Sequence, residues 1–197
     1  MEKAFQSAPE VVNGIEKVIR ERRSIREYRD EPVERELIIE LLSSSVWAPN
    51  HLKCEPWRFI LVDGEKREQM LKGIHDYYKS IGFLEKYSEN QLLNYKEQFL
   101  RIPAQLIVVM KDEEQEKRWE EAFAATCALV QNFQLLAWER GLGVVWKTNE
   151  HNASPIFKRS IGVLDSEKIV GILQLGYPLT IPKPKPRRSL EELITIL

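Results

Sequence analysis

One helix pattern constrains the fold of this chain more than any other feature. From about Trp119 to Arg140 the spacing of apolar residues predicts a long helix. Its middle, residues 123–130, is apolar nearly all round, and a helix of that kind has to be enclosed on most of its sides. In a chain of 197 residues a dimer interface is one economical way to enclose it, and its small residues would let a second helix approach closely.

The composition is that of one soluble globular domain. Apolar residues make up 43% and charged residues 30%, and the length suits a single domain with a full core, so we expect one domain over residues 1–197. Lys plus Arg (29) nearly equals Asp plus Glu (30), which argues against a protein that coats nucleic acid. No secretory pattern and no membrane-length apolar run is found, so we expect a cytoplasmic protein without a membrane partner.

The cysteines and histidines give no sign of a metal site. Cys54 and Cys127 lie far apart and form no C-x-x-C pair, which is typical of a reducing compartment. His51, His75 and His151 show no ligand spacing, so we expect no bound metal. We expect Cys54 to be exposed in a polar loop, Cys127 to pack as a small hydrophobe, and His75 and His151 to lie at the surface.

The remaining elements follow from periodicity and turn signals. Further helices are expected over 11–22, 33–46, 65–80, 84–100 and 154–162. Strands are expected over 57–62, 105–110, 144–146 and 169–176. The apolar run in 105–110 predicts a central strand buried on both faces, and the polar helix 84–100 predicts a solvated lid or edge. The proline-rich stretch 177–188 predicts an extended arm, and Ser189 a capped final turn.

The first candidate binding segment is Arg22-Arg23-Ser24-Ile25-Arg26. Guanidinium groups present planar, forked donors that suit phosphate and the oxygens of flat heteroaromatic rings. In a nearly neutral chain this cluster is not a general basic bias. Arg22, Arg23 and Ser24 could hold a phosphate, with Arg26 reaching a ring carbonyl or nitrogen. The segment alone is equally compatible with a surface of solvated arginines.

Two loops could contribute to the same site. Pro49 and Pro56 bracket a polar loop that can present Asn50, His51 and Lys53 to a ligand, although such a loop is also a common plain connection.

The segment Gly141-Leu142-Gly143 ends the long helix and begins a strand, the reverse of a dinucleotide-binding phosphate loop. Its glycines could let the backbone approach a flat ligand, or could simply cap the helix. At the end of the arm, Arg187 and Arg188 offer either a second pair of phosphate-binding arginines or an ordinary basic tail.

Taken in order, these segments resemble the nitroreductase family of FMN-dependent oxidoreductases. The resemblance covers roughly residues 15–192 through Arg-Arg-Ser-x-Arg, Ala-Pro-x₆-Pro-Trp, Gly-x-Gly-x-x-Trp-Lys-Thr and Pro-x-Pro-Arg-Arg. It implies an α+β fold with a central, mostly antiparallel sheet wrapped by helices. It also implies an intertwined homodimer with FMN at the subunit interface and a C-terminal arm that extends over the partner.

The resemblance assigns the phosphate end of that site to the first segment and the arm. Arg22 and Ser24 would hold the FMN phosphate, with Arg23 beside the ribityl chain. Arg187 or Arg188 would return to the phosphate from the arm.

Around the ring, the resemblance places Arg26 near the flavin N1 and O2 edge, where positive charge stabilises the anionic reduced flavin. The partner subunit would border the ring with Pro49, Asn50 and His51. The other edge would be formed by Trp146, Lys147 and Thr148. The chain departs from the family pattern at Lys53 and Glu55, where many longer relatives carry Asn and Gln, and lacks a glycine often seen after Thr148.

The resemblance implies an NAD(P)H-dependent enzyme that reduces nitroaromatic or quinone-like acceptors by ping-pong turnover. The flavin carries the chemistry, so no catalytic side chain is expected, and Arg26 tunes the cofactor. The sequence does not choose between NADH and NADPH. Two alternatives stay open. One is a flavin-consuming or reductive dehalogenating enzyme covered by segment 84–100, and the other is a flavin- or anion-binding regulatory protein without turnover.

Overall fold

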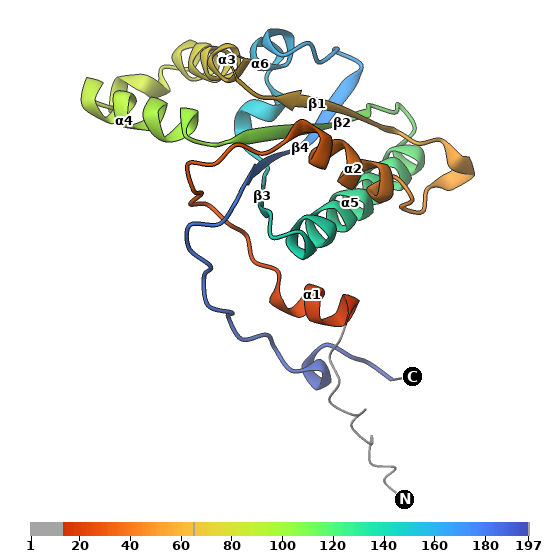
Figure 1. Cartoon of the computed structure of the whole chain (residues 1–197). Coiled ribbons are helices and arrows are strands. Elements are labelled where there is room, and N and C mark those ends of the chain that lie inside the picture. The colour runs from red at the N-terminus through yellow and green to blue at the C-terminus, as the bar shows by residue number, and fades with distance from the viewer. Residues whose placement is uncertain (1–13, 65, 197) are drawn as a thin grey trace, which may run out of the picture.

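The computed structural model describes residues 14–64 and 66–196, and its centre is an antiparallel sheet of four strands in the order β1-β2-β4-β3. The strands are Trp57–Val62 (β1), Ala104–Lys111 (β2), Gly143–Lys147 (β3) and Glu167–Gly176 (β4). Helices wrap this sheet, which confirms the expected α+β fold class (Figure 1).

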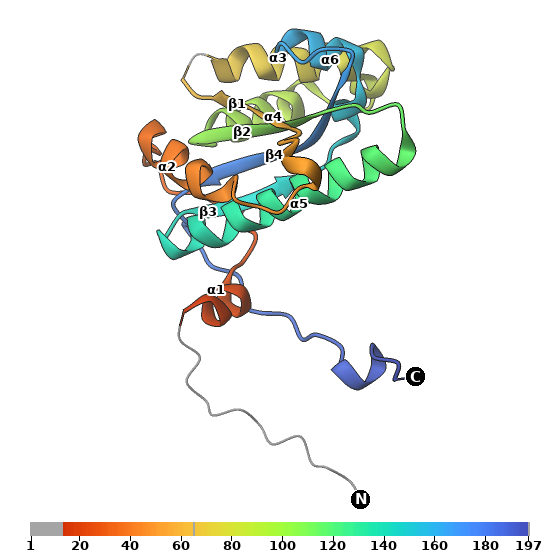
Figure 2. The same ribbon diagram turned by 90° about the vertical axis from the view of Figure 1, so that its right-hand side faces the viewer.

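Helices cover both faces of the sheet. On one side lie α2 (Arg35–Ser45) and α5 (Glu116–Glu139), and on the other α3 (Lys66–Ser80), α4 (Glu89–Leu100) and α6 (Pro155–Ser160), as Figure 2 shows. The first helix, α1 (Ile15–Glu21), lies outside these two layers, and the 11–13 part of its expected range is outside the described residues. Among the described residues no helix has both the length and the apolar character needed to cross a bilayer.

Strand β2 forms the middle of the core. Alternation along a strand sends Leu106 and Val108 into the core under α2 and α5, and Ile107 and Val109 into the core under α3 and α6. All four side chains are fully buried, which confirms the expected central strand with two buried faces.

Helix α5 contacts α1, and within one chain it is enclosed on the side that faces the sheet and α2. Leu129 and Phe133 are fully buried there, whereas Ala124 is exposed and Ala128 and Trp138 are half-buried on the remaining surface. The all-round apolar pattern is therefore only partly satisfied by the chain itself. The expected dimer interface on this helix stays a prediction.

The expectation of one helix over 84–100 is wrong. A 3₁₀ turn at Phe83–Lys86 comes first, and α4 begins after Ser88 with a capping box. The Gln91 backbone N–H donates to the Ser88 hydroxyl (3.4 Å), and the Ser88 N–H donates to the Gln91 side chain (2.9 Å). In a continuous helix these two backbone N–H groups would donate to carbonyls four residues earlier. Here they donate to side chains instead, so a new helix starts after Ser88.

The two ends of the described chain run together away from the sheet layers. Helix α1 and the extended arm after β4 project on the same side in Figures 1 and 2. Helix α1 buries no residue, and Ile15 and Ile19 are exposed. The arm ends in a 3₁₀ turn at Leu190–Glu192, but Ser189 makes no side-chain capping bond, so the expected cap is wrong.

Candidate functional site

The arginine segment runs beside the edge strand β3. The Ile25 N–H donates to the Val144 carbonyl (3.1 Å), and Ser24 forms a bridge with the same residue. Ile25 is fully buried, whereas Arg26 is exposed and Ser24 half-buried. Pairing with β3 therefore anchors the segment through Ile25, with its polar side chains to either side of that anchor.

Two paired glycines make room for this segment. A Cβ atom on Gly143 would lie 2.7 Å from the Ile25 side chain, and one on Gly176 would lie 2.6 Å from the Tyr28 ring. Gly143 and Gly176 are register partners on β3 and β4, so together they form a side-chain-free strip that Ile25 and Tyr28 cover. Gly143 thus admits Ile25, and the interpretation that it lets a ligand approach the backbone is wrong.

Gly141 has a different role. It ends α5 with φ 72°, and the Leu142 N–H donates to the Ala137 carbonyl (2.8 Å) while the Gly141 N–H donates to the Trp138 carbonyl (3.0 Å). These two bonds form a Schellman motif, which confirms the expected left-handed helix cap.

A basic cavity of about 600 Å³ opens where the segment meets the arm. Its basic lining residues, together with Ser24, are Arg20, Arg22, Arg23, Arg26, Lys183, Lys185 and Arg187. No acidic side chain is among its lining residues in the described part of the chain. We refer to this space as the basic cavity; Arg188 is exposed and does not line it.

The electrostatics of the basic cavity favour an anion. The pKa of Arg22 is lowered, first by burial and then by repulsion from Arg23 and Arg187. The Arg22 guanidinium has one long contact, 3.5 Å, to the Gln134 side chain, while Arg23 donates to the Arg20 and Arg22 carbonyls. A bound phosphate would relieve the mutual repulsion of these cations and accept hydrogen bonds from their guanidinium N–H groups.

A second cavity, of about 650 Å³, shares the lining residue Arg26 with the basic cavity. Lys147, Asn149, His151 and Gln174 also line it. The lining from α3, the 83–87 turn and α4 includes the polar residues Gln91, Asn94 and Gln98 and five aromatic ones: Tyr78, Phe83, Tyr87, Tyr95 and Phe99. We refer to this space as the aromatic cavity; its size and lining suit a flat ring system.

Of the three residues expected at the ring's second edge, only Lys147 lines the aromatic cavity. The Trp146 side chain packs over Gly171 with the α5 core, and its indole N–H donates to the Val170 carbonyl (3.3 Å). Thr148 is exposed.

The 49–51 loop lies apart from the arginines within one chain. The Asn50 side chain braces its own loop, since it donates to the Ala48 carbonyl (3.2 Å) and accepts from the Glu55 N–H (3.0 Å). Pro49 and His51 are exposed, and His51 lines a separate cavity beside α5. The placement of this loop at the partner's site, implied by the family resemblance, stays a prediction.

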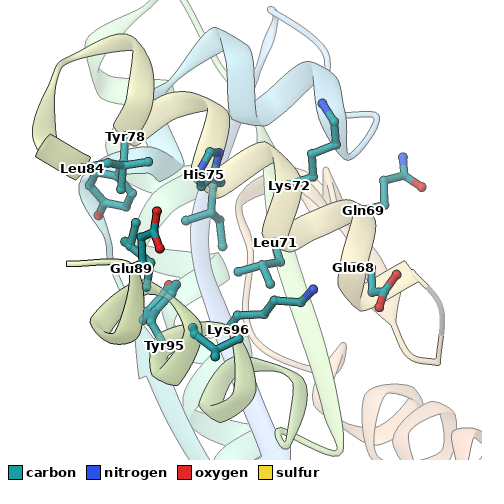
Figure 3. Close-up of a pocket in the computed structure, with 13 residues that line it drawn as sticks. Glu68, Gln69, Leu71, Lys72, His75, Tyr78, Leu84, Glu89, Tyr95 and Lys96 are labelled. Carbon is teal, nitrogen blue, oxygen red and sulfur yellow. The ribbon is translucent and has the colours of Figure 1, made fainter. Parts of the chain in front are cut away.

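A third cavity, of about 760 Å³, lies between α3 and α4 (Figure 3). Its lining is mainly apolar, with Lys72 and Lys96 among its charged residues, and Lys72 is paired with Asp76 at 2.7 Å. It shares Tyr78 and Tyr95 with the aromatic cavity. Helix α4 therefore borders two cavities, and the wall that it forms for the aromatic cavity has little packing behind it.

Sequence reasoning missed the polar groups contributed by residues 149, 151 and 174. The expectation that His151 lies at the surface is wrong: it is 3% exposed and packs edge-on against Phe157 and Tyr78. The 3₁₀ turn Glu150–Ala153 places it beneath α3 and α6. Cys127 is half-buried in the core and Cys54 is exposed, as expected.

The burial of His151 makes a prediction about stability. Burial lowers its pKa from 6.5 to about 4, so the unfolded chain binds the extra proton more readily than the folded protein between these values. The free energy of unfolding should therefore fall as the pH drops from about 6.5 towards 4, by up to about 3 kcal/mol. Urea unfolding at several pH values should show this loss, and a His151→Phe variant should lack most of it. An equal loss in both proteins would contradict the assignment to His151.

Within residues 14–64 and 66–196, no three His, Cys, Asp or Glu side chains gather as metal ligands.

Comparisons with known proteins agree with the fold and with the family resemblance. A family model described as the nitroreductase family matches residues 19–177. The chain is 37% identical over 178 residues to YfhC of Bacillus subtilis, a provisionally named NAD(P)H nitroreductase, which covers 90% of this chain and 91% of that protein.

Two solved structures extend the comparison. A nitroreductase-like family protein from Bacillus cereus is 40% identical, with a TM-score of 0.83 over 96% of this chain and 99% of that one. A provisionally named nitroreductase from Desulfovibrio desulfuricans, solved in complex with FMN, has a TM-score of 0.72 over 94% of this chain and 97% of that one. That protein is 23% identical and so supports the fold alone.

Proposed function

The chain belongs to the nitroreductase family, and on that premise we propose that it is an FMN-dependent oxidoreductase. Its proposed reaction passes hydride from NADH or NADPH to nitroaromatic or quinone-like acceptors by ping-pong turnover. The observation that carries this proposal is that Arg26 lines both the basic and the aromatic cavity. An anion-binding space and a ring-sized aromatic space therefore share one cationic side chain, an arrangement that suits a flavin mononucleotide.

The residues of the basic cavity fit a phosphate. Arg22 and Ser24 from the 22–26 segment, and Arg187 from the arm, surround the same space without an acidic neighbour in its described lining. We propose that these three hold the phosphate and that Arg23 lies beside the ribityl chain. Lys183 and Lys185 add positive charge and draw an anionic cofactor towards the cavity.

The residues of the aromatic cavity fit a ring with one polar edge. The aromatic residues offer stacking surface, and Arg26 and Lys147 add positive charge to the same lining. That charge favours added negative charge on a ring bound there. FMN, when bound, supplies the hydride acceptor and donor, so the chain needs only to bind, orient and polarise its ligands.

We propose a homodimer in which the 49–51 loop of one subunit borders the ring of the other. Support comes from the exposed apolar residues beside this loop, since Trp47 is 87% and Leu52 86% exposed. The half-exposed face of α5 lies next to the same loop, because the 51–53 turn contacts α5. Apolar surface of this extent is typical of a face that another chain covers.

Steady-state kinetics should distinguish the proposed mechanism from its alternatives. With FMN-loaded protein, rates measured over a grid of NADPH and nitroaromatic or quinone concentrations should give parallel double-reciprocal lines, because the donor leaves before the acceptor binds. Intersecting lines would contradict ping-pong turnover. FMN binding without any oxidation of NADH or NADPH would instead support a regulatory flavoprotein.

A further inference from the structure

Gln105 is an unusual residue for the centre of a core. It lies on β2, the strand with two buried faces, and is 0% exposed. Neither its side-chain nitrogen nor its side-chain oxygen has a hydrogen-bond partner among the described residues. Buried amides are nearly always paired in folded proteins, so an unpaired one needs an explanation.

The register of the sheet places a second glutamine beside it. Gln105 pairs with Gln174 of β4, and directly opposite residues of antiparallel strands project on the same face with Cβ atoms about 5 Å apart. Two positions along, Ile107 and Ile172 belong to the core under α3 and α6, which identifies that face. Gln174 lines the aromatic cavity together with Arg26 and Lys147. The buried amide therefore lies behind an amide that reaches the cavity.

Other polar groups nearby are already engaged. The Tyr28 hydroxyl is 2.8 Å from the Ile25 carbonyl and 3.0 Å from the Gln174 carbonyl. The Arg67 guanidinium donates to the Leu100 and Ile102 carbonyls, both at 2.8 Å. Among the described residues, no hydrogen bond joins the Gln105 and Gln174 side chains, but the register makes Gln174 the amide that lies beside Gln105 on this face.

We propose that Gln105 is a positioning residue for Gln174, and that the Gln174 amide contacts the imide edge of an FMN ring bound in the aromatic cavity. The inference rests on the proposed function. An amide carries both donors and an acceptor, so Gln105 can hold one end of the Gln174 amide while its other end meets a carbonyl or N–H of the ring. The ring's polar edge is then met by a cation, Arg26, and by an oriented amide. On this proposal, Gln105 makes its side-chain hydrogen bond only when FMN fills the cavity.

A Gln105→Leu variant tests this directly, because leucine keeps most of the volume and removes the unpaired amide. FMN-free Gln105→Leu should unfold at an equal or higher urea concentration than the wild type, since no hydrogen bond within the protein is lost. Its Kd for FMN, measured by quenching of flavin fluorescence, should nevertheless rise about threefold to tenfold. Ile107→Leu, on the same strand and face, is the matched control and should leave FMN affinity unchanged.

A double-variant cycle separates positioning from direct contact. Gln174→Met should weaken FMN binding by itself, and adding Gln105→Leu should weaken it no further, because Gln105 acts only through Gln174. Additive losses would overturn the positioning role. Lower urea resistance of Gln105→Leu with unchanged FMN affinity would also overturn it and show a purely structural amide. A wild-type protein that binds no FMN would refute the proposed function and this inference together, whereas FMN binding that is indifferent to Gln105 and Gln174 would refute the inference alone.

Discussion

Replacing Arg22 and Ser24 together with alanine should lower FMN affinity at least about a hundredfold. Each residue is proposed to make charge-assisted hydrogen bonds to the phosphate in a partly enclosed cavity, and each loss should cost about 1.5–3 kcal/mol. The folded protein should not suffer comparably, because Arg22 is repelled by Arg23 and Arg187 when no anion is present. Fluorescence titration with FMN measures the affinity, and urea unfolding of the FMN-free protein measures the stability.

Arg101→Ala is the matched control for this experiment. Arg101 is an exposed arginine at the end of α4 and is not among the residues lining the basic cavity. Its removal changes the net charge by the same amount as Arg22→Ala and should leave FMN affinity nearly unchanged. If the double variant bound FMN as tightly as the control, the phosphate role of the 22–26 segment would be refuted.

Gly143→Ala should reduce both stability and FMN affinity. The new Cβ would lie 2.7 Å from the Ile25 side chain, so the fully buried Ile25 has to move. Overpacking of this kind typically costs about 1–3 kcal/mol. Because Ile25 stands between Ser24 and Arg26, its displacement should also shift the phosphate and ring contacts and raise the Kd for FMN.

The neighbouring glycine provides a contrasting variant. Gly141 has φ 72° and no atom within 4 Å of its would-be Cβ, so Gly141→Ala should cost about 1–2 kcal/mol of backbone strain only. Its FMN affinity should match that of the wild type. Equal effects of both substitutions on FMN affinity would show that Gly143 does not position the arginine segment.

Much of the fold could be predicted because its signals are local. The strand 57–62 has the observed bounds, and the uninterrupted apolar run of β2 indicated a strand buried on both faces. The left-handed turn at Gly141 followed from a glycine directly after a long helix. The break at Ser88 was missed although its Ser-x-x-Gln signature is in the sequence, because the helical periodicity of 84–100 continues through it.

The candidate site was only partly predictable, since its parts meet through tertiary structure. The arginine cluster and Arg187 were found because they are dense local motifs, and both line the basic cavity. Gln174 joins Arg26 and Lys147 only through the register of β3 and β4 and the path of the 22–28 segment. The side chains of Trp146 and Lys147 project from opposite faces of the sheet, because side chains alternate along a strand. Treating the two residues as one contiguous motif hid this difference.

Anaerobic titration of the FMN-loaded protein with NADPH, and separately with NADH, tests the central proposal most directly. We expect the purified protein to take up FMN, and at least one donor to bleach the oxidised flavin absorbance with about one equivalent of donor. Addition of a nitroaromatic or quinone should then restore the colour. A protein that takes up no FMN, or whose bound flavin stays oxidised with both donors, would contradict the proposed function.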